Sequence, residues 1–93
     1  MNKTIHAYIS GKVQGVWYRD STISKAQQMG INGWVRNRAD GRVEMIAQGS
    51  SENIQKLIDW CWQGPQNARV DGVEYSEICD VEDLSDFIRR PTA

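Results

Sequence analysis

The residues best placed to do chemistry lie in one short segment that contains glycine and ends in arginine. Residues 11–19 read Gly-Lys-Val-Gln-Gly-Val-Trp-Tyr-Arg and precede a segment with helical spacing. A loop that carries Gly15 into a helix can turn successive backbone N–H groups toward one point, which is a favourable place for an anion. Arg19 would add a planar, permanently charged guanidinium that matches two phosphate oxygens. Many ordinary loops contain a glycine and an arginine, but together these residues predict a site for a phosphate group.

A second candidate is Asn37, which closes the run Gly-Trp-Val-Arg-Asn at residues 33–37. The run has the pattern of a strand, and a turn follows it. An asparagine at this place can cap the turn with its side chain. Its amide could instead hold a water molecule, and the residues alone leave both interpretations open.

The two cysteines do not occupy the place of a phosphatase nucleophile. In cysteine-dependent phosphatases the nucleophile stands six positions before the arginine that closes the phosphate loop, and here Val13 has that position. Asn67 and Ser85 stand six positions after Cys61 and Cys79. We interpret both thiols as reduced, partly buried side chains. If the loop holds a phosphoryl group, water must be the nucleophile.

Three further residues are formal candidates for a general base: His6, Asp20 and Asp40. Each has a structural interpretation that we favour, namely a strand face, the first turn of a helix and a hairpin turn. His6 is the only histidine, and the chain has no Cys-x-x-Cys pair. Because a zinc site lacks ligands here, we expect no metal ion and no cofactor.

Hydrophobic periodicity predicts the elements that must position these residues. Alternation predicts a strand over residues 4–10, two more strands over 31–36 and 42–48, and a hairpin turn at 37–41. A helix with Ile23, Ala26 and Met29 on its apolar face should end at Gly30.

The second half of the chain repeats this logic. A second helix should begin at Ser50 or Ser51 and end at Gly64, with an apolar stripe of Ile54, Leu57, Ile58 and Cys61. We expect Trp60 and Trp62 to pack at the margins of that stripe. A strand around residues 70–75, irregular at 71–72, and a short edge strand at 87–90 complete the chain.

The resulting order of strand, helix, strand, strand, helix, strand is the split βαβ arrangement of ferredoxin-like folds. We predict one α/β domain over residues 1–93. It should be an α+β sandwich with βαββαβ order, in which two helices pack on one face of an antiparallel sheet of four to five strands.

Composition and charge narrow the possible functions. Hydrophobic residues make up 40% and charged residues 25% of 93 residues, which excludes a disordered chain. The net charge of −1 disfavours nonspecific nucleic-acid binding. Residues 1–45 carry seven basic and three acidic side chains, so an anion site belongs in this half. With no apolar run of membrane-spanning length and no signal-peptide pattern, we expect a cytoplasmic protein that does not bind membranes.

Three runs of the sequence together resemble a known protein family. The run at 11–19, together with Gly-Trp-Val-Arg-Asn at 33–37 and Asp-Gly-Arg-Val-Glu at 40–44, resembles the acylphosphatase family. The block at 11–19 and the block formed by the runs at 33–37 and 40–44 both match at the spacing of that family. The resemblance covers essentially the whole chain. It implies a ferredoxin-like fold and a metal-independent hydrolase that cleaves acyl phosphates to a carboxylate and inorganic phosphate.

The resemblance also implies roles for individual residues. Arg19 matches the arginine that binds the substrate phosphate, and Asn37 matches the asparagine that orients the attacking water. The loop whose backbone amides surround the phosphate matches Gln14, Gly15, Val16, Trp17 and Tyr18. One departure is the ending, because many members end in Ile-Arg-Tyr whereas this chain reads Ile-Arg-Arg-Pro-Thr-Ala at 88–93.

Two other functions remain open for a chain of this fold. One is a noncatalytic module that binds a phosphorylated metabolite. The other is an RNA-binding sheet, for which only Tyr8 and Trp34 are candidate aromatic residues. Our prediction is a monomeric enzyme whose partner is a small acyl phosphate and which binds no nucleic acid.

Overall fold

The computed structural model describes residues 2–79 and 82–93. In chain order its elements are β1 (Asn2–Lys12), α1 (Tyr18–Gln28), β2 (Asn32–Asn37), β3 (Val43–Ser50), α2 (Ser51–Gln63), β4 (Arg69–Ile78) and β5 (Phe87–Arg89). The predicted order of strands and helices is confirmed, and β5 is the short edge strand that the sequence predicted at residues 87–90. No helix within the described residues is both long and apolar enough to cross a membrane.

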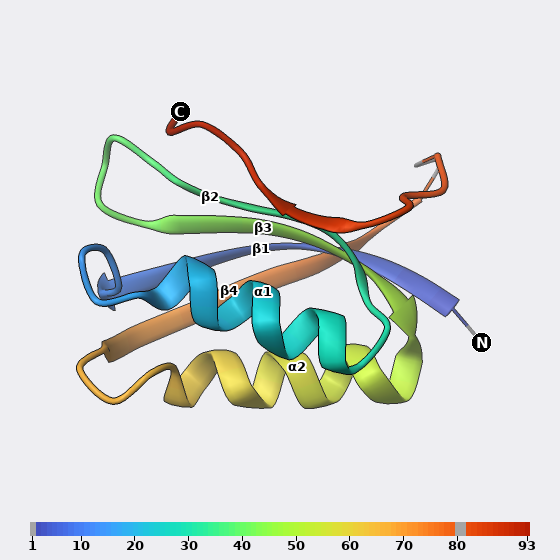
Figure 1. Cartoon of the computed structure of the whole chain (residues 1–93), viewed down its shortest axis with the longest axis horizontal. Helices are drawn as coiled ribbons and strands as arrows, with labels where there is room; N and C mark the ends of the chain where they lie inside the picture. The colour runs from blue at the N-terminus through green and yellow to red at the C-terminus, as the bar shows by residue number, and fades with distance from the viewer. Residues whose placement is uncertain (1, 80–81) are drawn as a thin grey trace.

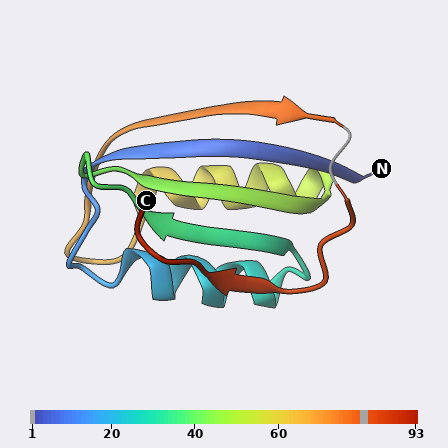
Figure 2. The same cartoon turned by 90° about the horizontal axis from the view of Figure 1, so that it is seen from above.

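The sheet has the strand order β4-β1-β3-β2-β5, which Figure 2 shows from above. The four longer strands pair antiparallel, as predicted. The edge strand β5 instead runs parallel to β2, so the sheet is mixed. The reason is the direction of β4, which ends at the end of the sheet where β2 begins. Because β5 lies at the opposite edge and also begins at this end of the sheet, it runs in the direction of β2.

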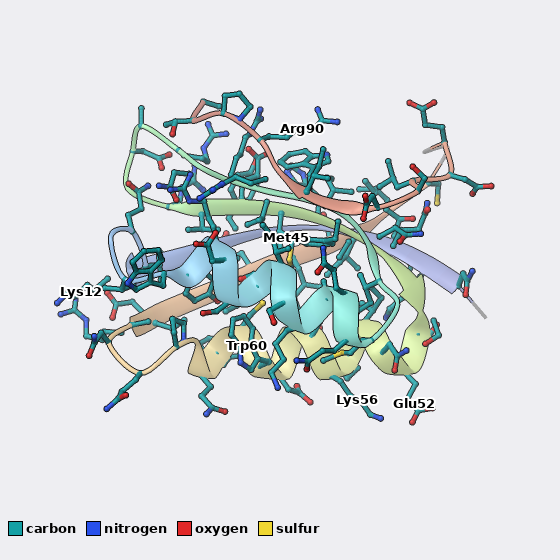
Figure 3. All side chains as sticks on the ribbon, viewed as in Figure 1. Lys12, Met45, Glu52, Lys56, Trp60 and Arg90 are labelled. Atoms are coloured by element: carbon teal, nitrogen blue, oxygen red, sulfur yellow. The ribbon has the colours of Figure 1, made fainter. Side chains whose placement is uncertain are left out.

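Both helices cover the same face of the sheet, as predicted (Figure 1). The predicted stripe on α2 is confirmed, because all four of its apolar residues are buried. Ser50 caps this helix, its hydroxyl accepting a hydrogen bond from Asn53 N at 3.1 Å. Trp60 lies at the margin, where α1 and α2 meet (Figure 3), and Trp62 is 52% exposed.

The buried face of α1 differs from the predicted one. Ala26 is buried, but Ile23 and Met29 are only partly buried against the core. The buried stripe consists of Tyr18, Thr22 and Ala26, which are spaced by four residues. Thr22 can lie in the core because its hydroxyl donates a hydrogen bond to Tyr18 O at 2.8 Å. A polar residue therefore occupies a core position that hydrophobicity alone assigns to its neighbour.

The irregularity predicted near residues 71–72 is a bulge between β1 and β4. The register shifts between Ser10 and Gly11, which pair with Gly72 and Val70. Gly11 has φ +121°, and a Cβ there would stand 2.2 Å from Arg69 O, so only glycine fits. The bulge lies at the end of β1 from which the chain enters the loop at residues 13–17.

A buried carboxylate lies on the sheet face that the helices leave open. Glu44 is 4% exposed. Its Oε1 accepts hydrogen bonds from Arg36 Nε at 2.8 Å and Arg38 Nη1 at 3.0 Å, and its Oε2 lies 2.6 Å from His6 Nε2. Burial raises the pKa of Glu44, but these hydrogen bonds lower it by more than burial raises it. The pKa is therefore about 2, below its ordinary value of 4.5.

This lowered pKa predicts acid sensitivity. Above pH 4.5 Glu44 is ionised in both states, and its interactions stabilise the fold fully; as the pH falls toward about 2, the unfolded chain binds the proton first and this stabilisation is lost. Glu44→Gln should therefore reduce the loss of unfolding free energy between pH 6 and pH 3, measured by urea denaturation. Glu74→Gln, an exposed residue on the same sheet face, is the matched control. Equal acid sensitivity in both variants would contradict the assignment.

Candidate active site

Three segments that are distant in sequence meet at one end of the sheet. The loop after β1, the end of β2 and the chain after β5 all lie at this end (Figures 1 and 2). A cavity of about 240 Å³ lies at this end, between the loop, the first turn of α1, the end of β2 and the last residue of β5. Its lining residues are Val13, Gly15, Trp17, Tyr18, Arg19, Asp20, Asn37 and Arg89. The two residues predicted to do chemistry, Arg19 and Asn37, therefore share one cavity.

The loop that enters α1 has an unusual backbone. Gly15 has φ +75° and Trp17 has φ +65°, both in the left-handed region. Trp17 is the N-cap of α1, and among the described residues it is the only one other than glycine with a positive φ. Left-handed residues close together turn backbone N–H groups to one side, and the N-terminus of a helix adds further N–H groups. This backbone has the features of an anion site.

Gln14 and Val16 support the loop rather than line the cavity. Gln14 Nε2 donates hydrogen bonds to the carbonyl oxygens of Arg38 at 2.8 Å and Arg42 at 2.9 Å, which ties the loop to the β2–β3 turn. Val16 is buried in the core. The sequence indicated only their backbone as important, and the structure adds a bracing role for the Gln14 side chain.

Tyr18 anchors the start of α1 in the core. It is buried, and its hydroxyl donates a hydrogen bond to Cys61 O at 2.7 Å. Burial raises the pKa of the Cys61 thiol to about 12, so this thiol stays protonated at neutral pH. Both cysteines are free, but Cys79 is exposed, so the prediction of partial burial is wrong for it.

Arg19 follows in the first turn of α1 and lines the cavity half-buried. Within residues 2–79 and 82–93 its guanidinium makes no ion pair or hydrogen bond. Most of the other arginines at this end of the sheet form ion pairs. Arg42, for example, pairs with Asp40 at 2.7 Å. All five N–H donors of Arg19 are thus available to a ligand.

Asn37 brings an unpaired acceptor to the same cavity. Its Oδ1 is buried and has no hydrogen-bond partner among the described residues. The turn that follows is closed by Asp40, whose Oδ1 accepts from Arg42 N at 3.0 Å, so the structure gives no support to Asn37 as a turn cap. The Asn37 backbone is fixed on the other side, because its carbonyl oxygen accepts from Ala93 N at 3.0 Å. A buried polar atom without a partner is costly, and such atoms require an explanation in a native structure.

Sequence reasoning missed Arg89 at this site. Its Nη1 lies 3.3 Å from Asp20 Oδ1, and both side chains are about half-exposed at the cavity. Arg89 follows the buried Phe87 by two residues, so both side chains lie on the helix side of the sheet. That alternation is the only signal in the sequence, and it is useful only once β5 is placed beside β2.

The three candidate bases lie in different parts of the structure. Asp20 lies at the cavity, in the first turn of α1 as expected. His6 lies on the open sheet face beside Glu44, and Asp40 lies in the β2–β3 turn with Arg42. Within the described part of the chain, no group of three or more His, Cys, Asp or Glu side chains is arranged to hold a metal ion.

Comparison with known proteins identifies the family. A model of the family described as Acylphosphatase matches residues 5–88. This chain belongs to the acylphosphatase family. The acylphosphatase of Methylococcus capsulatus is 45% identical over 85 residues, which cover 91% of this chain and 92% of that protein.

Solved acylphosphatase structures have the same fold. The acylphosphatase from Coxiella burnetii aligns with a TM-score of 0.92 at 45% identity, covering 96% of this chain and 93% of that one. The acylphosphatase from Bacillus subtilis also aligns with a TM-score of 0.92, at 29% identity, covering 97% and 99% of the two chains. The predictions of an acylphosphatase-family enzyme and of a ferredoxin-like fold are confirmed.

Proposed function

We propose that this acylphosphatase-family enzyme hydrolyses acyl phosphates in the cavity between the loop at residues 13–17 and the end of β2. A positioned water molecule attacks phosphorus directly, and the products are a carboxylate and inorganic phosphate. The observation that carries this proposal is the meeting of an unpaired guanidinium, Arg19, and an unpaired buried acceptor, Asn37 Oδ1, in one cavity.

The phosphoryl group is held by the loop and by Arg19. Backbone N–H groups of residues 14–19 donate to the phosphate oxygens, with the left-handed conformations at Gly15 and Trp17 turning them to one side. Arg19 donates two parallel hydrogen bonds from its guanidinium. Because phosphoryl transfer passes through a loose transition state, positioning and charge stabilisation of this kind supply most of the catalysis.

Asn37 orients the nucleophile. Its Oδ1 accepts a hydrogen bond from water, which directs a lone pair of the water oxygen at phosphorus. The new oxygen–phosphorus bond forms as the bond from phosphorus to the acyl oxygen breaks, and the electron pair leaves on the carboxylate. A phosphate oxygen takes the proton from the water. A carboxylate with a conjugate-acid pKa of about 4 leaves without a general acid.

The experiment that tests this function is release of inorganic phosphate from acetyl phosphate by the purified chain. We expect catalysis that is unchanged by a chelator and not abolished by thiol alkylation. Loss of turnover with EDTA and recovery with a divalent ion would contradict the mechanism. Phosphate binding without turnover would favour the noncatalytic alternative. A metal-independent cytoplasmic monomer, without nucleic-acid or membrane partners, stays our prediction.

Arg89 should support phosphate binding by neutralising Asp20. In Arg89→Gln the Asp20 carboxylate faces the dianionic phosphate without its partner at 3.3 Å, and we expect the inhibition constant of inorganic phosphate to rise about threefold to tenfold. The double variant Asp20→Asn/Arg89→Gln should recover most of that loss. Arg90→Gln is the control, because Arg90 lies over Trp34 on the face away from the helices (Figure 3). Phosphate affinity unchanged in Arg89→Gln would remove Arg89 from the site.

A further inference from the structure

We infer that the indole of Trp17 is the binding surface for the acyl group and that the enzyme favours acyl phosphates with flat, apolar acyl groups. The inference rests on the proposed function and adds the substrate class to it. It is carried by three features of Trp17: its backbone conformation, its exposure and its place at the cavity.

The backbone conformation of Trp17 is one that bulky residues rarely adopt. With φ +65° and ψ 22° the residue lies in the left-handed region, where glycine has no steric cost. The loop uses a glycine for its other left-handed position, Gly15. Strained backbone of this kind is found preferentially at functional sites. A tryptophan at position 17 therefore needs a reason that the conformation of the loop does not supply.

The side chain of Trp17 has no structural role that would supply this reason. It is 75% exposed, the most exposed large hydrophobic side chain among the described residues. No aromatic stacking or cation–π contact of its ring occurs within residues 2–79 and 82–93, whereas Trp34 lies under Arg36 and Trp60 lies against Tyr18. The indole thus contributes little to the core while it exposes a large apolar surface to water.

The cavity places this surface where the acyl group must emerge. A substrate whose phosphoryl group is held by the loop and by Arg19 must extend its acyl group within the same cavity, and Trp17 is part of the cavity lining. The other apolar side chains of the lining, Val13 and Tyr18, are buried. Trp17 is the exposed apolar surface of the cavity.

The charged side chains that line the cavity favour a neutral acyl group. Asp20 and Arg89 pair with each other at 3.3 Å, and Arg19 is assigned to the phosphate, so the lining leaves no unpaired charge for the acyl group. Burial of an apolar acyl group against the indole favours binding in proportion to the area that is covered. A flat acyl group can also stack on the indole. Benzoyl phosphate is the plainest probe of this preference, and acetyl phosphate is the small reference.

The test compares the ratio of kcat/KM for benzoyl phosphate to kcat/KM for acetyl phosphate across variants. Trp17→Gly and Trp17→Asn both fit the left-handed backbone and remove the indole. We expect each to lower the ratio about tenfold. Trp17→Phe retains a flat ring and should keep the ratio within about threefold of the parent. Trp62→Ala, which removes an exposed tryptophan of α2, should leave it unchanged.

The ratio separates this inference from the proposed function. If Trp17→Gly and Trp17→Asn lose activity on both substrates equally, the residue only shapes the phosphate loop and the inference is overturned. A ratio that stays the same with no loss of activity overturns it as well. If the unmodified chain releases phosphate from neither substrate, the proposed function itself fails.

Discussion

Arg19→Lys should lower kcat for acetyl phosphate about 10²- to 10³-fold, although the substitution keeps the positive charge. A lysine ammonium is a compact point charge and cannot donate two parallel hydrogen bonds to phosphate oxygens. Arg19 makes no ion pair or hydrogen bond through its guanidinium within the described residues, so its replacement breaks no polar contact of the fold. Inhibition by inorganic phosphate should weaken as well. Initial rates and phosphate inhibition, measured on one preparation with its thermal midpoint, check these expectations.

Arg90→Lys is the matched control for this experiment. Arg90 lies 5.0 Å from the ring centroid of Trp34, outside the cavity lining, and its replacement should leave kcat and phosphate inhibition unchanged. If Arg19→Lys keeps near-normal turnover and phosphate affinity, then Arg19 is only a charge at the start of α1. The loop would in that case have to bind phosphate through its backbone alone.

Asn37→Ala should separate chemistry from binding. Its Oδ1 is assigned to the attacking water, so kcat should fall about 10²-fold or more while inhibition by inorganic phosphate stays nearly constant. The free energy of unfolding should change by less than about 1 kcal/mol, because the lost oxygen has no partner in the described structure. Kinetics, phosphate inhibition and urea denaturation on the same sample provide the three quantities.

Asn32→Ala offers a control of the same residue type on the same strand. Asn32 Nδ2 donates a hydrogen bond to Leu84 O at 2.8 Å, away from the cavity, so its loss should reduce stability and leave kcat intact. If Asn37→Ala shows this pattern instead, with normal turnover per folded molecule, Asn37 has a structural role. Water would then lack an identified positioning group.

Local patterns in the sequence were sufficient to predict most of the fold. Alternation in β1 and the apolar stripe of α2 depend on neighbours a few residues apart, and both were correct. The direction of β5 was not predictable in this way, because a strand of three residues has too little pattern and its partner β2 lies about 50 residues earlier. The buried face of α1 was predicted wrongly because Thr22, a polar residue, is buried there. Its hydroxyl forms a local hydrogen bond with a backbone carbonyl oxygen.

Some residues of the candidate site were also predictable from the sequence, and others were not. The family resemblance pointed to Arg19 and Asn37, and the fold places both at one cavity. Arg89 was missed because it reaches the cavity only through the pairing of β5 with β2. The hydrogen bonds of Gln14 to the β2–β3 turn join residues 24 and 28 positions apart, which no local pattern reports.

The central claim is that water attacks phosphorus in this cavity, and hydrolysis in ¹⁸O-labelled water tests it most directly. Acetyl phosphate is turned over by the chain in labelled water, and mass spectrometry then locates the label in the two products. Attack at phosphorus puts one ¹⁸O atom into inorganic phosphate and none into acetate, which is the result we predict. Label in acetate would mean attack at the acyl carbon and would contradict the roles assigned to Arg19 and Asn37, as would phosphate release no faster than in buffer alone.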